Sequence, residues 1–327
     1  MYNWVNTSFI IIFLNCYVAV RKNHLIIFMH KYIITRLRMS VHLSPVIAGT
    51  MNWGVWQANF NPAQMAAIIN DCISYGITTF DHADIYGGYT TEADFGLGFA
   101  QSGVKREDVQ FITKCGIQHT VGNRPTKVKH YNYSKDYIIW SAENSLKFLK
   151  TDYLDVLLLH RPSPLMHPGE IAEAIHHLKG QGKIREFGLS NFTSSQTDLI
   201  KSLLHVYCNQ IEFSATAFQP MLDGSLDYMQ LHNIKLMAWS PVGSVFKSDS
   251  EQSLRLQTLL LEFVEKYEVT ADVILLAWIM QHPAGIVPVS GSCNTNRLKN
   301  QVKAANLKLE LEDWFAIWTE SMGHKVP

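Results

Sequence analysis

Four ionisable or hydrogen-bonding side chains stand at or just after the ends of apolar runs in this sequence. The run Ile77–Phe80 stops at Asp81, and the phenol of Tyr86 follows in the next few residues. Lys114 and His160 end two further apolar runs in the same way. A buried strand that ends in such a residue delivers it to the edge of a sheet, where parallel strands gather functional groups. We therefore expect these four residues to form one catalytic site.

Together, these residue types suit acid catalysis on a carbonyl oxygen. A phenol has a reference pKa of about 10 and is a weak acid at neutral pH. We expect the Lys114 ammonium to lower the pKa of Tyr86, while the Asp81 carboxylate holds Lys114 charged and in place. Tyr86 would protonate an oxygen that becomes negative, and His160 would orient that oxygen. Each residue alone also has a structural interpretation, as a cap, a packed ring or a side chain that reaches water.

The rest of the chain predicts a scaffold of parallel strands for these residues. Eight short apolar runs alternate with stretches that carry apolar residues at helical spacing. Eight such units favour a parallel α/β architecture that closes as a (β/α)8 TIM barrel in a single domain. An open doubly wound sheet is the rival, but no G-x-G-x-x-G follows an early strand. The predicted strands are Val46–Thr50, Ile77–Asp81, Val109–Lys114, Tyr153–His160, Ile184–Ser190, Val206–Ile211, Ile234–Trp239 and Ile286–Val289.

Helix signals and loops complete the alternation. Asn61-Pro62 opens one predicted helix, and Thr193 with Gln196 forms a capping-box pattern that opens another. Two helices, over about Glu251–Tyr267 and Thr270–Gln281, precede the last strand. Two long loops, Gly116–Tyr133 and Pro241–Ser250, would hang over the carboxyl ends of the strands, where barrel active sites lie.

Composition limits the class of protein. The chain has 327 residues, of which 47% are apolar and 17% charged, as in a soluble globular enzyme. Twenty-eight basic residues balance 28 acidic ones, so nothing points to nucleic acid or a membrane surface as a partner. The five cysteines are far apart and lack a C-x-x-C, which argues against a disulfide framework or a zinc site. A reducing, cytoplasmic setting is expected.

The first 28 residues do not fit the alternating pattern. Their apolar stretch, Val5–Val20, is interrupted by polar residues and falls short of the about 20 apolar residues that span a bilayer. Arg21 and Lys22 follow this stretch, whereas a signal peptide carries its basic residues in front. We expect residues 1–28 to be an appendage and 29–327 to be the barrel domain, with a short membrane anchor as the alternative.

Several motifs in one order resemble the aldo-keto reductases. They are Phe80–Tyr89 (FDHADIYGGY), Ile112–Gly116 (ITKCG), Leu157–Pro162 (LLLHRP) and Gly188–Phe192 (GLSNF). The resemblance runs from about Met29 to Pro327. Gly87–Tyr89, His130–Ser134 and Met322–Pro327 are similar to a poorly characterised bacterial branch, which tends to carry a glycine where this chain has Lys129.

The resemblance implies a catalytic tetrad of Asp81, Tyr86, Lys114 and His160 and an NADPH cofactor. An arginine suits the cofactor's 2′-phosphate, but Gly291 stands where many members have a second cation, so NADPH preference over NADH is expected to be weaker. The implied cofactor residues are Thr50 near the nicotinamide; Ser190, Asn191 and Gln210 on its carboxamide; Trp239 stacked on its ring; Ser240, Val242, Gly243 and Ser244 at the pyrophosphate; Ser292 and Arg297 at the 2′-phosphate; and Gln301 near the adenine.

The leading hypothesis is therefore an NADPH-dependent reductase of aldehydes or ketones, with a small carbonyl compound as partner. Alternatives are a cofactor-sensing regulatory subunit without turnover, a Schiff-base aldolase that uses Lys114, and a metal hydrolase with His82, Asp84 and His160 as ligands. The identity of the substrate and the oligomeric state are not readable. The residues expected to wall the substrate pocket are Trp53, Trp56, Tyr131, Phe246 and the tail Trp314–Pro327.

Overall fold

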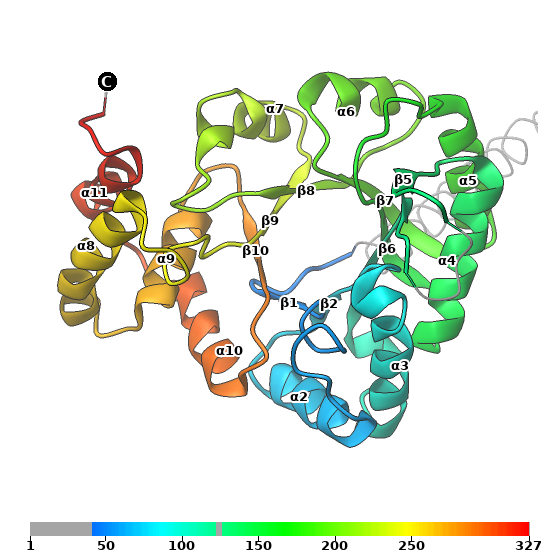
Figure 1. The fold of residues 1–327 in the computed structure, drawn as a ribbon, viewed down its shortest axis with the longest axis horizontal. Coiled ribbons are helices and arrows are strands. Elements are labelled where there is room, and N and C mark those ends of the chain that lie inside the picture. Colours follow the sequence, from blue (N-terminus) through cyan, green and yellow to red (C-terminus); the bar gives the residue numbers. More distant parts are fainter. Residues whose placement is uncertain (1–40, 122–125, 327) are drawn as a thin grey trace, which may run out of the picture. The chain divides into compact units, whose positions relative to one another are not determined.

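The computed structural model describes residues 41–121 and 126–326. The predicted appendage 1–28 lies outside the described residues. Eight parallel strands close into a barrel in the order β1-β2-β3-β6-β7-β8-β9-β10, with β10 paired back to β1 (Figure 1). These strands are β1 (Ile47–Gly49), β2 (Thr79–Asp81), β3 (Gln110–Cys115), β6 (Leu154–Leu159), β7 (Ile184–Ser190), β8 (Cys208–Glu212), β9 (Lys235–Trp239) and β10 (Val287–Ser290). The predicted TIM barrel is confirmed.

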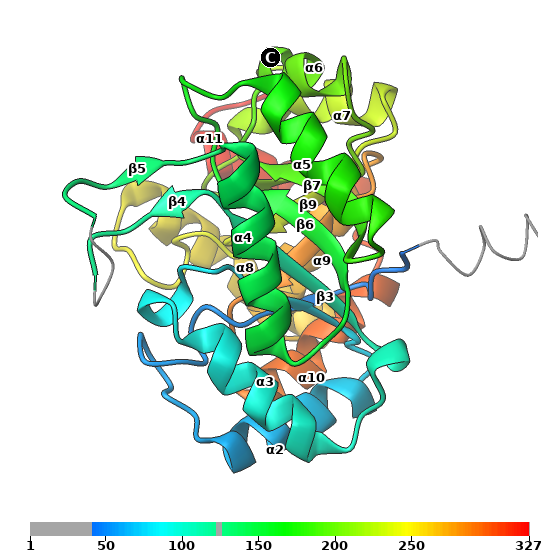
Figure 2. The same cartoon turned by 90° about the vertical axis from the view of Figure 1, so that its right-hand side faces the viewer.

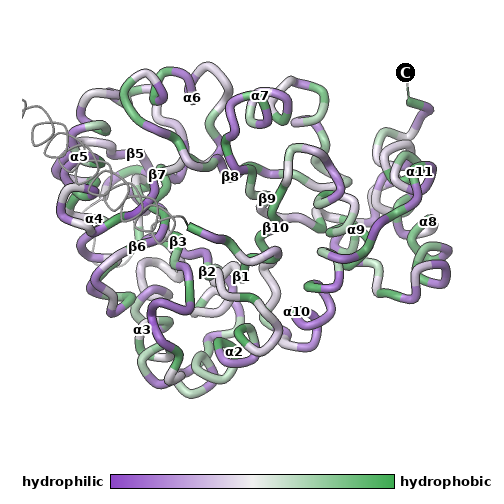
Figure 3. The backbone as a smooth tube through the Cα atoms, turned by 180° about the vertical axis from the view of Figure 1, so that it is seen from behind, coloured by the Kyte–Doolittle hydropathy of each residue, from purple (hydrophilic) through white to green (hydrophobic). Residues whose placement is uncertain are grey.

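Helices surround the strands in a ring, as Figure 1 shows. The predicted caps hold: Asn61 and Thr193 each exchange hydrogen bonds with the glutamine three residues later. Hydrophilic and hydrophobic residues alternate along the outer helices (Figure 3), because one face packs on the strands and the other meets water. The helices are α2 (Pro62–Ser74), α3 (Thr91–Ser102), α4 (Lys135–Leu149), α5 (Pro168–Gly180), α6 (Ser194–Lys201), α7 (Ser225–Leu231), α8 (Glu251–Tyr267), α9 (Ala271–Met280), α10 (Thr295–Gln301) and α11 (Leu311–Met322).

Three helices and a hairpin were not predicted. The helices α7 and α10 have only seven residues each, whereas α11 has 12 and carries apolar residues at helical spacing that the sequence analysis did not use. Within the expected loop Gly116–Tyr133, the pieces β4 (Ile117–Gln118) and β5 (His130–Tyr131) pair antiparallel, and the hairpin projects from the barrel (Figure 2). The tail was expected at the pocket; its helical part, α11, packs against α8, and Trp314 stacks on Trp278 of α9. Within 41–121 and 126–326, no helix is long and apolar enough to cross a membrane.

The barrel register decides which side chains face inward. Asp81 pairs with Ile112, and Lys114, two residues further along β3, pairs with Leu158. Side chains alternate along a strand, so all four of these residues share one face. Their neighbours Phe80, Phe111 and Leu157 belong instead to the large core between strands and helices. The face that holds Asp81 and Lys114 is therefore the inside of the barrel.

An ion cluster lies at the amino-terminal end of the barrel. The carboxylate of Asp155, fully buried at the start of β6, accepts hydrogen bonds from Arg106 at 2.7 Å and Arg185 at 2.9 Å. It also accepts one from the backbone N–H of Phe111 at 2.9 Å. Both guanidinium groups stack on the ring of Tyr153, at 4.0 and 3.9 Å from its centre. The Asp155 carboxylate is thus paired through both oxygens, and the two arginines share this one negative charge.

Candidate active site

The four residues of the predicted tetrad meet at the carboxyl end of the barrel strands. Asp81 ends β2, Lys114 lies near the end of β3, and His160 directly follows β6. Tyr86 opens a 3-10 turn, η1 (Tyr86–Gly88), in the loop after β2. Because the barrel register places the first three on its inner face, the loop after β2 needs only to fold back over the mouth to add the phenol. The structure therefore brings all four together.

Lys114 is the centre of this group. Its ammonium, only 1% exposed, donates hydrogen bonds to Asp81 Oδ2 at 2.6 Å, to the carbonyl oxygen of His82 at 2.7 Å and to Tyr86 Oη at 3.0 Å. Burial by itself lowers the pKa of Lys114, but Asp81 and Tyr86 outweigh it and raise the pKa above the ordinary lysine value. A Schiff-base lysine must be neutral to attack a carbonyl. These contacts therefore argue against the aldolase alternative.

Tyr86 departs from the expected direction. Burial raises the pKa of its phenol above the ordinary value, although the Lys114 ammonium acts to lower it. The prediction of a lowered pKa is therefore wrong for the protein without ligands, because loss of solvation outweighs the single nearby cation. The phenol is protonated across the neutral range, which is the state that a proton donor needs.

His160 lies next to Tyr86, with ring centres 6.1 Å apart and nearly perpendicular planes. Burial, and then the positive charge of Lys114, lower the pKa of His160 well below its ordinary value. The imidazole is therefore neutral at physiological pH and offers one N–H for donation. Its buried Nδ1 has no hydrogen-bond partner in the described part of the chain.

A residue that the sequence predicted in another role completes the group. Gln210, in the middle of β8, donates from Nε2 to Asp81 Oδ1 at 2.9 Å. Its expected partner was the nicotinamide carboxamide, and nothing in the sequence near Asp81 signals this contact. Both oxygens of the Asp81 carboxylate thus have partners, Lys114 on one and Gln210 on the other. The carboxylate is held in one orientation.

Thr50 lies beneath Asp81. It is fully buried, and its hydroxyl bonds to the Asp81 carbonyl oxygen at 3.0 Å and to His82 Nδ1 at 2.9 Å. The His82 ring packs edge-on against Phe95, with centres 4.3 Å apart. Thr50 and His82 therefore support the strand that carries Asp81. Among the residues in 41–121 and 126–326, no three His, Cys, Asp or Glu side chains gather closely enough to hold a metal.

The residues expected at the carboxamide form a connected set. The β-strand register continues from β7 to β9, so Ser190, Gln210 and Trp239 share the inner face with Lys114. Asn191 adopts a left-handed backbone conformation, with φ of 63°. Its side chain donates to Ser190 Oγ at 2.8 Å and accepts from Trp239 Nε1 at 2.9 Å. This bond fixes the plane of the indole ring at the barrel mouth.

The loop after β9 contains the residues expected at a pyrophosphate. Ser240 is exposed, with φ of 50°, and Val242 packs against the core. Gly243 has φ of 56°, and a Cβ there would stand 2.0 Å from Thr216 Oγ1. The next backbone N–H, that of Ser244, donates to the same hydroxyl at 3.0 Å. Only glycine lets the backbone pass this close to Thr216.

The segment after β10 divides into exposed and buried parts. Arg297 is exposed on the first turn of α10, and Ser292 precedes that helix. Gln301, in contrast, is only 4% exposed; it accepts from Ser290 at 2.6 Å and donates to Asp272 at 3.0 Å. Its amide therefore ties β10 and α10 to α9. Arg297 and Ser292 are placed to meet a ligand from solvent, while Gln301 is occupied inside the protein.

One of the residues expected to wall the pocket differs from expectation. Trp53, expected as a pocket wall, is fully buried and packs on Phe80 and Phe95, so that expectation is wrong. Trp56 is 47% exposed and lies edge-on to Tyr86, with ring centres 6.1 Å apart. Tyr131 and Phe246 are also exposed. Trp56 is therefore the aromatic wall nearest the phenol.

The sequence reasoning missed Glu92, a buried carboxyl group in the barrel wall. It accepts hydrogen bonds from Thr113 at 2.5 Å and Ser145 at 3.0 Å. Burial raises its pKa to about 7. Thr113 precedes Lys114 but faces the helices, so Glu92 lies behind the site. Glu92 lies in the first turn of α3, where a glutamate is usually a surface residue that interacts favourably with the helix dipole. Its sequence position therefore gave no sign that it is buried.

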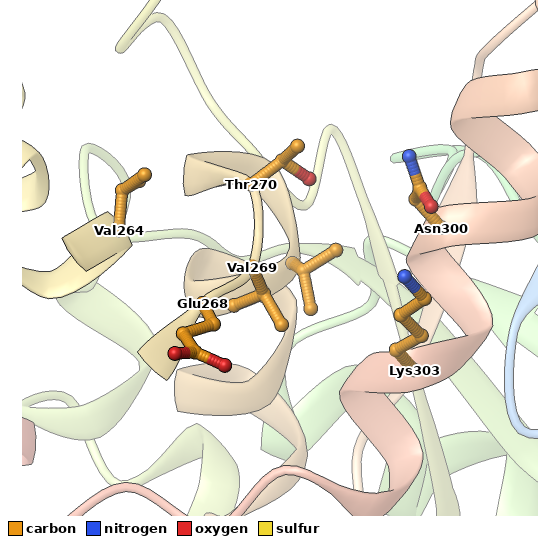
Figure 4. A pocket seen from close by; sticks show the side chains of 7 residues that line it. Val264, Glu268, Val269, Thr270, Asn300 and Lys303 are labelled. Atoms are coloured by element: carbon orange, nitrogen blue, oxygen red, sulfur yellow. The ribbon is translucent and has the colours of Figure 1, made fainter. Parts of the chain in front are cut away.

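A separate pocket of about 360 Å³ lies outside the barrel (Figure 4). Glu268 and Val269, between α8 and α9, face Asn300 and Lys303 across it. None of the predicted site residues lines it. This pocket is therefore distinct from the site at the barrel mouth.

Fold and site together define a (β/α)8-barrel oxidoreductase. The family model for the aldo/keto reductase family matches residues 45–319, and the chain belongs to this family. The uncharacterized oxidoreductase YcsN of Bacillus subtilis (strain 168) is 42% identical over 298 residues, 89% of this chain and 99% of that protein. Oxidoreductase YdhF of Escherichia coli (strain K12) is 38% identical over 279 residues, 84% of this chain and 93% of that protein.

A solved structure agrees with this assignment. The crystal structure of the thermostable aldo-keto reductase Tm1743, in complex with the inhibitor epalrestat, superposes with a TM-score of 0.73 at 26% identity. The match covers 85% of this chain and 95% of that one. The expected family and barrel fold are thus confirmed. The chain is an aldo-keto reductase, an oxidoreductase that depends on a nicotinamide cofactor.

Proposed function

We propose that this protein reduces an aldehyde or ketone to an alcohol with NADPH, and that Tyr86 is the proton donor. The observation that carries the proposal is the buried hydrogen bond of 3.0 Å between Lys114 Nζ and Tyr86 Oη. A phenol that is kept protonated and touches a fixed ammonium can release its proton when negative charge forms on a neighbouring oxygen.

The residues at the mouth fit a nicotinamide cofactor. A flat indole held by Asn191 suits a flat pyridine ring, and the Ser190–Asn191 pair offers a hydroxyl and an amide to a carboxamide. Gly243 and its left-handed backbone give the loop after β9 a tight turn, a type of backbone that can direct N–H groups at a phosphate. We propose Trp239, Ser190 and Asn191 for the nicotinamide end and Ser240, Val242, Gly243 and Ser244 for the pyrophosphate.

We assign Thr50, Gln210 and Gln301 supporting roles. Thr50 and Gln210 hold Asp81 through its backbone carbonyl and its side chain, and Gln301 fixes the helix that bears Arg297. Arg297 and Ser292 are proposed to bind the 2′-phosphate, since a guanidinium recognises phosphate bidentately. Gly291 is exposed and adds no cation, so the preference for NADPH over NADH is expected to be modest.

The chain's residues divide the work of reduction. NADPH, when bound, supplies the hydride that goes to the carbonyl carbon. Tyr86 and the neutral His160 donate hydrogen bonds to the carbonyl oxygen, which orients it and favours the negative charge that develops there. Tyr86 then gives up its proton to this oxygen. Lys114 stabilises the phenolate that remains, and Asp81 keeps Lys114 charged and directed at Tyr86.

The experiment combines cofactor binding with a carbonyl screen on the same sample. Quenching of protein fluorescence by NADPH measures the Kd, and NADPH oxidation with a panel of aldehydes and ketones measures turnover. Tyr86→Phe should lower kcat by about 10²- to 10⁴-fold and leave the NADPH Kd within about twofold. Tyr75→Phe, half-buried at the opposite end of the barrel, is the matched control.

The outcomes separate the alternatives. Near wild-type turnover in Tyr86→Phe would remove Tyr86 from the proposed role. Tight NADPH binding without turnover on any carbonyl would favour the cofactor-sensing regulatory subunit over the reductase.

A further inference from the structure

Arg161 is a cation at the barrel mouth that the tetrad and the proposed cofactor site leave without a role. It follows His160 in the chain and is half-buried. Its guanidinium carbon lies 5.4 Å from the centre of the Trp239 ring. Because we propose that the nicotinamide stacks on Trp239, the Arg161 guanidinium lies near the place where the carbonyl substrate would bind.

The guanidinium of Arg161 has no counterion in the described residues. No carboxylate there lies within the 4.0 Å that defines an ion pair, whereas Arg106 and Arg185 share Asp155. A half-buried charge without a partner is costly to maintain. A binding partner that brings negative charge would recover this cost.

The backbone of Arg161 is held firmly in place. The Tyr133 hydroxyl donates to the Arg161 carbonyl oxygen at 2.5 Å and accepts from the Arg161 N–H at 3.1 Å. The Tyr133 ring can reach this position because Gly116 has no side chain: a Cβ there would stand 2.0 Å from the ring. Tyr133 itself is only 5% exposed. A clamp on both backbone groups fixes the point from which the side chain extends toward the Trp239 ring.

The field of Arg161 reaches the reacting groups. Its positive charge acts to lower the pKa of Tyr86, which burial nevertheless raises. It also adds to the lowering of the His160 pKa by burial and Lys114. Lys129, on the hairpin above the mouth, adds a further positive contribution at His160. Lys129 is exposed, however, and a solvated ammonium selects ligands weakly. Arg161 is the better placed of the two to recognise a charged group.

We propose, on the basis of the proposed reductase function, that Arg161 determines specificity by binding an anionic group of the carbonyl substrate. A carboxylate is the simplest such group, because the planar guanidinium pairs with it through two parallel hydrogen bonds. The preferred substrates are then aldehydes or ketones that carry a carboxylate, with Trp56 against their apolar part.

The test compares two aldehydes that differ mainly in charge, 4-carboxybenzaldehyde and methyl 4-formylbenzoate. The wild type should reduce the carboxylate with the higher kcat/KM. Arg161→Gln should lower kcat/KM for the carboxylate by roughly 10- to 100-fold and change that for the neutral ester by less than about threefold. Arg161→Lys should fall between, because it keeps the charge and loses the planar fork.

Lys105→Gln is the matched control, since it removes one exposed positive charge at the amino-terminal end of β3. It should leave both kcat/KM values unchanged. The NADPH Kd of every variant is measured alongside, which also reports that each variant is folded.

Three results would overturn the inference. The first is a wild type that prefers the ester; this result needs no variant. The second is an equal loss for both aldehydes in Arg161→Gln, and a raised NADPH Kd would then assign Arg161 to the cofactor. The third is no loss for either aldehyde in that variant. If none of the carbonyl compounds supports oxidation of NADPH by the wild type, the proposed function itself fails.

Discussion

The two ends of the barrel each bury a cluster of charged groups, and the clusters differ in how fully their polar groups are bonded within the protein. At the amino-terminal end, Asp155 is shared by Arg106 and Arg185, and the backbone of Phe111 adds a further donor. At the carboxyl end, Lys114 and Asp81 are paired at 2.6 Å, but the pair also holds the Tyr86 phenol. Beside it stand His160, whose Nδ1 has no partner in the described residues, and Arg161, which lacks a counterion there.

This difference indicates which end is built for stability and which for chemistry. The charged groups of the Asp155 cluster are bonded to one another, whereas incomplete bonding at the mouth leaves groups available to a ligand. The same strands carry both, because β3 and β6 run from the Asp155 cluster to Lys114 and His160. The following predictions test this division, from the largest expected effect to the smallest.

Replacing the ion pair at the mouth should abolish chemistry and spare the fold. The double variant Asp81→Asn, Lys114→Met should lower kcat by about 10²- to 10⁴-fold, because Tyr86 loses its positive neighbour. Its free energy of unfolding should stay within about 1 kcal/mol of the wild type, since neutral replacement of a buried pair is tolerated. Turnover assays and urea denaturation measure the two effects. A strongly destabilised double variant would mean that this pair is structural.

Breaking the cluster at the other end should do the reverse. Asp155→Asn leaves two arginines without their shared carboxylate and should lower the free energy of unfolding by about 3 kcal/mol. The kcat of the folded variant should remain within about twofold of the wild type. Denaturation and turnover well below the melting temperature are the measurements. A large loss of kcat with unchanged stability would contradict the division between the two ends.

Glu92, buried between the two ends, should make stability depend on pH. Its pKa is raised from 4.5 to about 7, so between these values the folded state keeps a proton that the unfolded state releases. The free energy of unfolding therefore falls as pH rises through this window. Glu92→Gln cannot ionise and should gain about 2 kcal/mol relative to the wild type between pH 5 and pH 8.

Denaturation of both proteins at the two pH values checks this prediction. Glu107→Gln, which removes an exposed acid, is the control and should show no such gain. An equal difference between Glu92→Gln and wild type at both pH values would show that Glu92 does not hold a proton in the fold.

The mouth itself should be nearly insensitive to pH. The Tyr86 pKa is raised, so the proton donor is lost only above about pH 10, and the His160 pKa is lowered, so the imidazole gains a proton only well below about pH 6.5. With saturating NADPH, kcat/KM for a neutral aldehyde should vary by less than about twofold from about pH 6.5 to pH 9. An alkaline fall centred near pH 8 would mean that bound cofactor reverses the effect of burial on Tyr86.

Much of the fold was predictable because it rests on local patterns. β7 spans Ile184–Ser190 and α8 spans Glu251–Tyr267, both with the predicted bounds. The run Val156–Leu159 in β6 is continuously apolar because both faces of that strand are buried. The hairpin β4–β5 was not predicted because each of its strands has only two residues, too few to show an alternation of apolar and polar residues. The helices α7 and α10 were not predicted for the same reason, with seven residues each.

The candidate site was predictable in membership and less so in its contacts. Asp81, Lys114 and His160 stand where strands end, which a single sequence reveals. Gln210 was identified as part of the site, but its bond to Asp81 spans 129 residues and depends on barrel closure. The pKa of Tyr86 moved against expectation because burial, which no local pattern reports, outweighed the neighbouring ammonium.

By itself, then, the sequence determined the alternation of strands and helices and the reactive residue at each strand end, since both follow from spacing along the chain. Only the tertiary structure decided which of these groups are paired and which remain available to a ligand. That decision depends on the register of a closed barrel, which brings Trp239 from β9 to Arg161 after β6 and leaves this cation without a carboxylate in the described residues. Distances and solvation between such remote residues are properties of the folded chain alone.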